Sequence, residues 1–254
     1  MAGAERVYGW HAVRALLLRA ASRVQRVWLA QDRRDARAQE IERLAVEANL
    51  PIERVPVARL EQLAGEVAHQ GVMAEIQPLP PWREDDLYAA LRDHAAPLLL
   101  ALDGVQDPHN LGACLRSADA CGVVALIVPR DRAATLNPAA RKVAAGAAES
   151  TPVVTVTNLA RTLGLLKESG LWIVGADATA ALPAQSVDLT GPRCLVLGSE
   201  GRGLRELTRR HCDWLVALPN LGAVESLNVS VAAGMLLYEA VRQRAGAAGA
   251  PPGA

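Results

Sequence analysis

The second part of the chain alternates short apolar runs with mixed stretches of helical length. The first run, "PLLLALDGV" from Pro97, is almost continuously apolar, as expected for a strand buried on both faces. Further runs of this kind are "VVALIVP", "PVVTVT", "LWIVGA", "RCLVLGS" and "DWLVALP". Because helical segments lie between several of them, the pattern predicts an α/β domain with a parallel sheet over residues 97–244.

The first part of the chain also alternates helices and strands, in shorter pieces. Two predicted helices each have one apolar face, formed by Val13, Leu16 and Leu17 in the first and by Ala38, Ile41, Ala45 and Ala48 in the second. The runs "VQRVWLA", "IERVP" and "GVMAEIQ" predict strands, with a short helix around Leu60. We therefore expect a small α/β domain over residues 1–77, a linker over residues 78–96 and a disordered tail over residues 245–254.

The overall charge of the chain does not identify a partner, but the local charge of its first residues is informative. The 254 residues include 27 Lys plus Arg and 27 Asp plus Glu, a balance that neither favours nor excludes a nucleic-acid partner. Residues 1–30 hold five arginines against one glutamate, which indicates either a solvated helix face or a local contact for nucleic acid.

The cysteines and the apolar runs argue against several kinds of site. The four cysteines form no C-x-x-C pair and no histidine lies at zinc-finger spacing, so we expect no metal site and reduced, buried thiols in a cytoplasmic protein. No run of 18 apolar residues predicts a membrane span.

Two predicted strands run into loops that could hold a ligand, in "LVLGSEGRG" and "WLVALPNLG". In open parallel sheets, ligands bind beyond the carboxyl ends of the strands. The glycines of "GSEGRGL" indicate a close approach of the backbone, but their spacing matches neither the dinucleotide fingerprint nor the Walker loop. The two loops are therefore expected to line one ligand site.

The stretch "DGVQDPHNLGACLRSADACG" predicts a strand, a turn and a helix. Asn110 is expected to cap this helix and Gly122 to end it. Arg116 lies inside the helix among small residues, which would let another chain segment or a substrate approach its guanidinium. The alternative is a surface ion pair with Asp119, three residues further on.

A third stretch, "LPNLGAVESLNVSVAAGMLLYEAVRQR", predicts a helix that begins near Ser226 to Asn228 and is apolar on most sides. Such a helix is buried in a core or at a subunit interface. Ser226 and Asn228 at its start are either helix caps or site residues.

Taken in this order, the three stretches resemble one family. N-L-G-x-x-x-R, L-x-L-G-x-E-G-x-G-L and E-S-L-N-V-S-V-A resemble the motifs of the SpoU branch of the SPOUT RNA methyltransferases. "YGWHAVRALL", "HQGVMAEI", "VAAGAAESTPVVTVTNLART" and "GLWIVGADA" resemble its bacterial 23S rRNA guanosine-2'-O-methyltransferases. The resemblance extends from Tyr8 to Arg244.

The resemblance implies a parallel-sheet methyltransferase domain with a trefoil knot and an N-terminal α/β domain that is L7Ae-like and binds 23S rRNA. It also implies a homodimer that packs through the C-terminal domain. The implied cofactor is S-adenosylmethionine, held by Leu197, Gly198, Gly201, Leu218, Pro219 and Leu227. The implied reaction is 2'-O-methylation of a ribose, with the catalytic residues Arg116, Asn110, Glu200, Ser226 and Asn228.

Because arginine is effectively always protonated, we expect Arg116 to hold a substrate phosphate and stabilise developing alkoxide charge. The hydroxyl proton would leave to a phosphate oxygen, to water, or to an Arg116 made unusually acidic by its pocket. The side chains of Asn110, Ser226 and Asn228 would orient Arg116 and the ribose, and Glu200 would position the loop or a substrate group.

Other functions stay open from the sequence. A tRNA ribose methylase or a resistance-type rRNA methylase would share the three motifs. A noncatalytic RNA-binding protein would not need Arg116, Asn110 and the Ser226–Asn228 pair together. A nucleotide-dependent oxidoreductase would share the α/β sheet, but its early G-x-G-x-x-G is absent.

Overall fold

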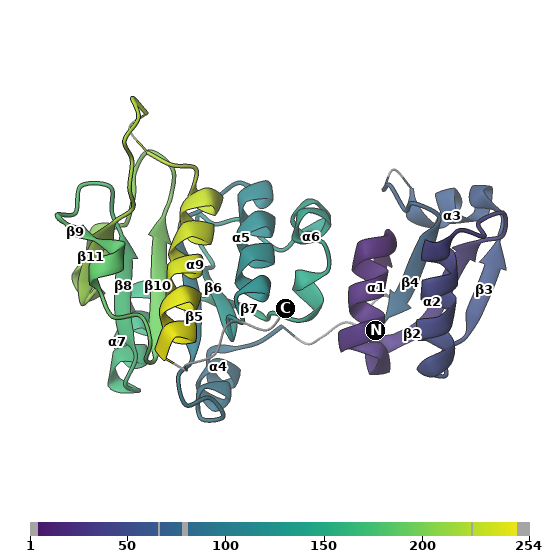
Figure 1. Cartoon of the computed structure of the whole chain (residues 1–254), viewed down its shortest axis with the longest axis horizontal. Coiled ribbons are helices and arrows are strands. Elements are labelled where there is room, and N and C mark those ends of the chain that lie inside the picture. The colour runs from purple at the N-terminus through teal and green to yellow at the C-terminus, as the bar shows by residue number, and fades with distance from the viewer. Residues whose placement is uncertain (1–4, 66, 78–80, 225, 248–254) are drawn as a thin grey trace. The chain divides into compact units, whose positions relative to one another are not determined.

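The computed structural model describes residues 5–65, 67–77, 81–224 and 226–247, and the chain forms two compact units (Figure 1). Unit 1 comprises Met1–Pro80 with Ala145–Ser150, and unit 2 comprises Pro81–Ala144 with Thr151–Ala254. Each unit has its own sheet.

Unit 1 is a small mixed sheet with helices. Its strands are β1 (Glu5–Tyr8), β2 (Val24–Ala30), β3 (Ile52–Val55) and β4 (Val72–Ile76), in the order β1-β4-β2-β3. Its helices are α1 (Trp10–Arg19), α2 (Ala36–Glu47) and α3 (Val57–Ala64). The predicted helices and strands of this part are confirmed. The short edge strand β1 was not predicted, because "ERVY" carries no apolar run.

The core of unit 1 forms where the apolar faces were expected. Val13, Leu16 and Leu17 of α1 are buried. In α2 the buried residues are Ala38, Ile41, Leu44 and Ala45, whereas Ala48 lies just past the helix as its C-cap. The predicted face was therefore one residue too long and lacked Leu44.

The arginines of the basic opening segment mostly have partners within unit 1. Arg14 pairs with Glu40 (2.7 Å), Arg26 with Glu53 (3.6 Å) and Arg23 with Glu149 (2.9 Å). Arg6 donates to the carbonyl of Leu63 (2.8 Å). These contacts neutralise much of the local positive charge that the sequence suggests.

Unit 2 contains a seven-stranded sheet in the order β7-β6-β5-β10-β8-β11-β9, and every recorded pairing is parallel. Its strands are β5 (Leu98–Asp103), β6 (Ala125–Pro129), β7 (Val153–Val156), β8 (Trp172–Ala176), β9 (Leu182–Pro183), β10 (Arg193–Gly198) and β11 (Trp214–Ala217). Every residue of β5 is buried, as the continuous apolar run predicts. The predicted parallel α/β sheet is confirmed, and only the two-residue β9 was missed.

Helices cover this sheet. They are α4 (Glu84–Leu91), α5 (Pro108–Ala120), α6 (Pro138–Ala144), α7 (Leu159–Glu168), α8 (Glu206–His211) and α9 (Val229–Ala247). Figure 1 shows α5 and α9 side by side on one face of the sheet, and the two helices pack on each other.

Two stretches differ from their expected character. The range predicted as a linker contains α4, whose Leu87 and Leu91 are spaced by four residues and lie in the core of unit 2. Helix α9 continues to Ala247 and so takes in the start of the predicted tail. The rest of the predicted tail, residues 248–254, lies outside the described residues.

All four cysteines are free, and Cys114 and Cys194 are buried. Burial raises the pKa of the Cys114 thiol to about 12, so it stays protonated and inert at neutral pH. Within the described ranges, no cluster of three or more His, Cys, Asp or Glu side chains could hold a metal ion. No helix in the part of the chain that the structure describes is both long and apolar enough to cross a membrane.

A glycine sets the contact between α5 and α6. A Cβ on Gly112 would lie 2.4 Å from the carbonyl oxygen of Ala140 and 2.8 Å from the Cβ of Val143. The small residues of α5 therefore admit another chain segment, α6, at this point.

We expect Gly112→Ala to lower the free energy of unfolding by about 1–3 kcal/mol, because the added methyl group forces α5 and α6 apart. Gly234→Ala in α9 is the matched control, since its Cβ would meet only the Ser117 hydroxyl at 3.8 Å. Alanine is the better helix former, so the control should gain about 0.5–1 kcal/mol. Urea unfolding measures both, and equal stability of Gly112→Ala and wild type would contradict the packing argument.

Candidate functional site

The strand order of unit 2 reverses beside β5, with β6 and β7 on one side and β10 and β8 on the other. At such a switch point the loops at the carboxyl ends of the strands diverge and leave a crevice. The loop after β10, residues 199–204, therefore lies between the loops that follow β5 and β8. This is the "GSEGRGL" loop of the sequence.

A cavity of about 400 Å³ opens at this edge of the sheet, within the size range of small-molecule sites. It is lined by the loops after β8, β10 and β11 and by the start of α9. The expected cofactor residues among its lining are Leu197, Gly198, Gly201, Leu218 and Leu227. Pro219 is not among the lining residues and is exposed next to Leu218.

One wall of this cavity is formed by residues that were not predicted as site residues. Asp177 and Thr179, beyond the end of β8, and Arg209 of α8 also line it. The signal was available, because "LWIVGA" is a third strand whose carboxyl end faces the same edge.

Asp177 and Arg209 form an ion pair on this wall. The Asp177 carboxylate also accepts hydrogen bonds from the Thr179 backbone N–H (2.8 Å) and hydroxyl (2.7 Å). Burial raises the pKa of Asp177, but the hydrogen bonds from Thr179 and the charge of Arg209 outweigh it, so the pKa lies below its ordinary value. Asp177 is therefore ionised at neutral pH.

The glycines of the loop after β10 close the loop on itself. Ser199 and Gly203 exchange backbone hydrogen bonds of 3.2 and 2.9 Å, and Gly201 and Gly203 have φ angles of 76° and 65°. A Cβ on Gly198 would lie 2.0 Å from the carbonyl carbon of Gly203. Gly198 is thus required by the loop itself, and a side chain there cannot leave this loop intact. The close approach that the glycines predict is, at Gly198, an approach of the chain to its own backbone.

Three side chains far apart in the sequence form a closed polar cluster. The carboxylate oxygen Oε1 of Glu200 accepts from the amide Nδ2 of Asn110 (3.1 Å) and of Asn228 (2.7 Å). The Asn228 amide also donates to Oδ1 of Asn110 (3.0 Å). We call Asn110, Glu200 and Asn228 the polar cluster.

Local helix capping places two members of the polar cluster. Asp107, not Asn110, caps α5, since its carboxylate accepts from the His109 N–H (2.9 Å) and Pro108 begins the helix. The prediction that Asn110 caps the helix is wrong, and its side chain is free to reach Glu200. The prediction that Asn228 caps a helix is confirmed, because its Oδ1 accepts from the Ser230 N–H (2.9 Å) at the start of α9, and its amide group reaches Glu200.

Arg116 and Ser226 lie outside the polar cluster. Arg116 is exposed on α5, six residues beyond Asn110 or about 9 Å along the helix. It has no hydrogen bond or ion pair with any described residue, and Asp119 instead accepts from the Thr151 hydroxyl (3.3 Å). Ser226 is exposed and lines the cavity.

A second cavity of about 630 Å³ lies on the other side of the β10 loop. It is formed by this loop together with the loops after β5 and β6. Glu200 lines both cavities and Asn110 lines the second. The polar cluster therefore stands at the boundary between the two cavities.

Comparison with known proteins agrees with this geometry. The model of the SpoU rRNA Methylase family matches residues 97–238. The chain belongs to this family. A model for the substrate-binding part of RNA 2'-O ribose methyltransferases matches residues 6–82. The resemblance based on the three motifs is confirmed.

Relatives of this SpoU methylase cover nearly its whole length. The 23S rRNA (guanosine-2'-O-)-methyltransferase RlmB of Pseudomonas aeruginosa is 54% identical over 241 residues, 94% of this chain and 97% of that protein. Its Escherichia coli counterpart is 49% identical over 240 residues, 94% and 99% of the two chains. The crystal structure of the SpoU methyltransferase AviRb from Streptomyces viridochromogenes in complex with the cofactor AdoMet has a TM-score of 0.76 and 26% identity, covering 96% of this chain and 92% of AviRb.

Gly198→Ala should remove ligand binding in the first cavity together with part of the stability, because the methyl group overlaps the backbone of Gly203. Gly170→Ala is the matched control: Gly170 lines neither cavity and nothing lies within 4 Å of its Cβ, so the variant carries only the backbone strain of a positive φ, about 1–2 kcal/mol. Calorimetry with S-adenosylmethionine and thermal melting test the pair. Unchanged affinity and melting temperature of Gly198→Ala would disprove this role of the loop.

Proposed function

We propose that this SpoU methylase transfers a methyl group from S-adenosylmethionine to the 2'-hydroxyl of a guanosine in 23S rRNA. The observation that carries the proposal is the polar cluster, which borders a cavity of cofactor size on one side and a larger cavity on the other. The names of the RlmB relatives supply the substrate class.

The first cavity fits the chemistry of the cofactor. Leu197, Leu218 and Leu227 offer apolar surface to a neutral adenosine. The carboxylates of Asp177 and Glu200 are balanced by Arg209 and Arg202, which line the same cavity, so the lining has no excess of positive charge of the kind a phosphate site needs. When bound, S-adenosylmethionine supplies a methyl group on a sulfonium, which is a good electrophile.

The chain's own residues position the nucleophile. Glu200 binds the two amides of the polar cluster, which fixes Asn110 and Asn228 for contact with the ribose. Arg116 is exposed and lines neither cavity, so its role as a cation that holds a substrate phosphate and stabilises developing alkoxide charge rests on the family motif. The hydroxyl proton passes to a phosphate oxygen or to water, and Ser226 helps to orient the ribose.

Finer features of the family belong to the same proposal. An L7Ae-like fold and an rRNA-binding role for residues 1–77 are supported by the mixed sheet of unit 1 and the match to a substrate-binding family. A trefoil knot in residues 97–244 is supported by membership of the SpoU family alone. An rRNA substrate also favours a cytoplasmic location. The domain limits stay predictions.

The function is tested by mapping methylated riboses on 23S rRNA and tRNA after incubation with labelled S-adenosylmethionine. We expect a single 2'-O-methylguanosine in 23S rRNA. Methylation of tRNA alone would replace the rRNA proposal by a tRNA ribose methylase, and binding of RNA without transfer would contradict catalysis.

Arg116→Ala should reduce turnover by about a hundredfold or more if Arg116 stabilises charge in the transition state. Affinity for S-adenosylmethionine should be unchanged, because Arg116 lines neither cavity. Arg116→Lys should restore little activity, since a point charge does not replace a planar fork. Single-turnover methylation of an rRNA fragment measures all three proteins, and a near wild-type rate for Arg116→Ala would remove Arg116 from the mechanism.

A homodimer through the C-terminal unit is proposed from the outer face of α9. Val231 and Tyr238 are 51% and 67% exposed there on a helix that is otherwise largely apolar. Light scattering should give twice the 26.9 kDa of one chain. Tyr238→Asp should shift the mass toward one chain, whereas Leu207→Asp, at an exposed position of α8, should not. A wild-type monomer at micromolar concentration would contradict the dimer.

A further inference from the structure

The second cavity carries more positive charge than the polar cluster requires. Arg132, Arg202 and Arg205 line it. Its two carboxylates already accept hydrogen bonds. Glu200 accepts from the amides of the polar cluster, and Asp107 accepts from the His109 N–H in the first turn of α5.

Arg205 has a structural role in this cavity. Its backbone N–H donates to the carboxylate of Asp103 (2.8 Å), and its guanidinium lies 3.4 Å from the same carboxylate, whose side chain is 0% exposed. The guanidinium also donates to the carbonyl of Asp131 (3.4 Å). Arg205 thus compensates a buried charge at the end of β5.

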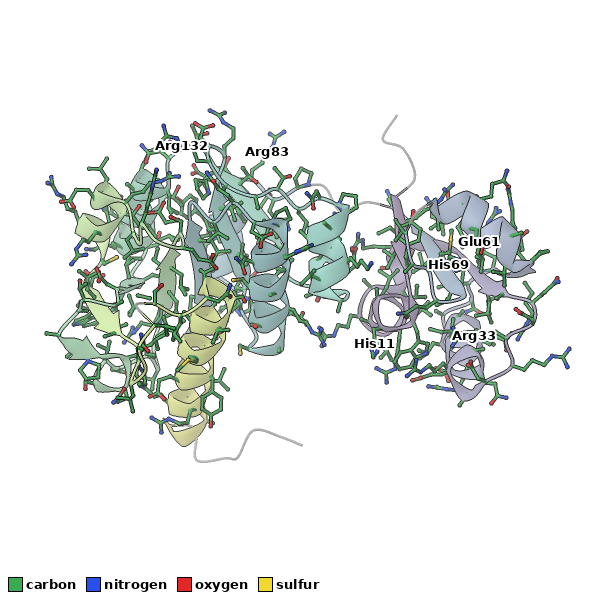
Figure 2. The ribbon with its side chains drawn as sticks, turned by 90° about the horizontal axis from the view of Figure 1, so that it is seen from above. His11, Arg33, Glu61, His69, Arg83 and Arg132 are labelled. Atoms are coloured by element: carbon green, nitrogen blue, oxygen red, sulfur yellow. The ribbon has the colours of Figure 1, made fainter. Side chains whose placement is uncertain are left out.

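Arg132 and Arg202 are in the opposite situation. Both are exposed, and neither makes a hydrogen bond or ion pair with any residue in the described part of the chain. Figure 2 shows Arg132 at the periphery of unit 2. Two unpaired guanidinium groups at one cavity form a natural contact for anions.

The backbone at Arg132 supports a ligand role. Its φ of 57° is left-handed, which is uncommon for a residue with a side chain. Hydrogen bonds hold the loop on both sides of Arg132. The Ala134 N–H donates to the carbonyl of Val105 (2.7 Å), and the Arg205 guanidinium donates to the carbonyl of Asp131. Such conformations persist where the surroundings impose them, and they cluster at ligand sites.

We propose that Arg132 and Arg202 bind the backbone phosphates that flank the target nucleotide, whose nucleoside occupies the second cavity. The inference rests on the proposed function and names its substrate contacts. The cavity of about 630 Å³ has the size of a nucleotide site, and Glu200 links it to the first cavity, where the methyl donor would lie. Planar guanidinium groups bind phosphate oxygens in pairs, so they hold the chain on either side of the ribose.

The test uses the full-length chain and a 23S rRNA fragment that contains the nucleotide methylated by the wild type. Arg132→Gly and Arg132→Asn both tolerate a left-handed backbone, so they remove the charge without unfolding the loop. Arg202→Gln removes the second charge. Arg92→Gln is the matched control, since Arg92 is an exposed arginine at the end of α4 that lines neither cavity.

Each variant at Arg132 or Arg202 should weaken binding of the fragment by about tenfold and lower the slope of log affinity against log salt by about 1. Arg132 lines the second cavity and not the first, so the Arg132 variants should keep the wild-type affinity for S-adenosylmethionine, measured without RNA. Arg92→Gln should match the wild type throughout. If the wild type methylates the fragment but the variants bind it with unchanged affinity and salt slope, the inference is overturned.

A second measurement identifies the phosphates. The fragment is made with neutral methylphosphonates on both sides of the target nucleotide. The wild type should bind this modified fragment about tenfold or more weaker than the unmodified one. The double variant Arg132→Gly, Arg202→Gln, which already binds the unmodified fragment weakly, should bind the two fragments with nearly equal affinity. Equal losses for both proteins overturn the assignment. A wild type that transfers no methyl group to any rRNA fragment instead overturns the proposed function, and the inference with it.

Discussion

The site depends on one packing constraint, the insertion of β10 between β5 and β8. Parallel pairing on both sides holds β10 in the centre of the sheet, and its residues from Arg193 to Leu197 are buried. The loop that follows must therefore turn sharply at the carboxyl edge, and it can do so because Gly198 lets the backbone of Gly203 pack against it. Both cavities form against this one loop, so the site is a consequence of the strand order.

The polar cluster follows from the same arrangement. Glu200 is carried by the β10 loop, Asn110 by the first turn of α5 and Asn228 by the residue before α9. Helices α5 and α9 pack against each other on one face of the sheet, which brings their first turns to the loop. The β10 loop and the starts of two packed helices thus hold three polar side chains together without burying them.

Much of the fold was predictable because its signals are local. The continuous apolar run of β5 and the apolar face of α1 each determine their element from a few residues. Elements whose signal is weak or absent escaped prediction: β1 and β9 are short, and α4 lies among prolines and charges. The strand order could not be predicted, because the pairing of β10 with β5 joins segments that are about a hundred residues apart.

The site was predictable in part for the same reason. Strand-end glycines point to a ligand from the local pattern alone, and Leu197, Leu218 and Leu227 do meet at one cavity. Asp177 was not predicted although it directly follows the predicted strand "LWIVGA", whereas nothing in the sequence around Arg132 marks that residue. Arg132 is distinguished only by its backbone conformation and by the absence of a partner among the described residues, and both are properties of the folded chain.

The double role of Asn228 settles which way its amide faces. Its oxygen accepts from both the backbone N–H and the hydroxyl of Ser230 at the start of α9, which leaves only the NH2 group for Glu200 and Asn110. A helix cap thus acts as the reference that sets the direction of every hydrogen bond in the polar cluster. Asparagine and aspartate, which are nearly equivalent as caps, are not interchangeable here, because a carboxylate at this position would place a second negative charge against Glu200.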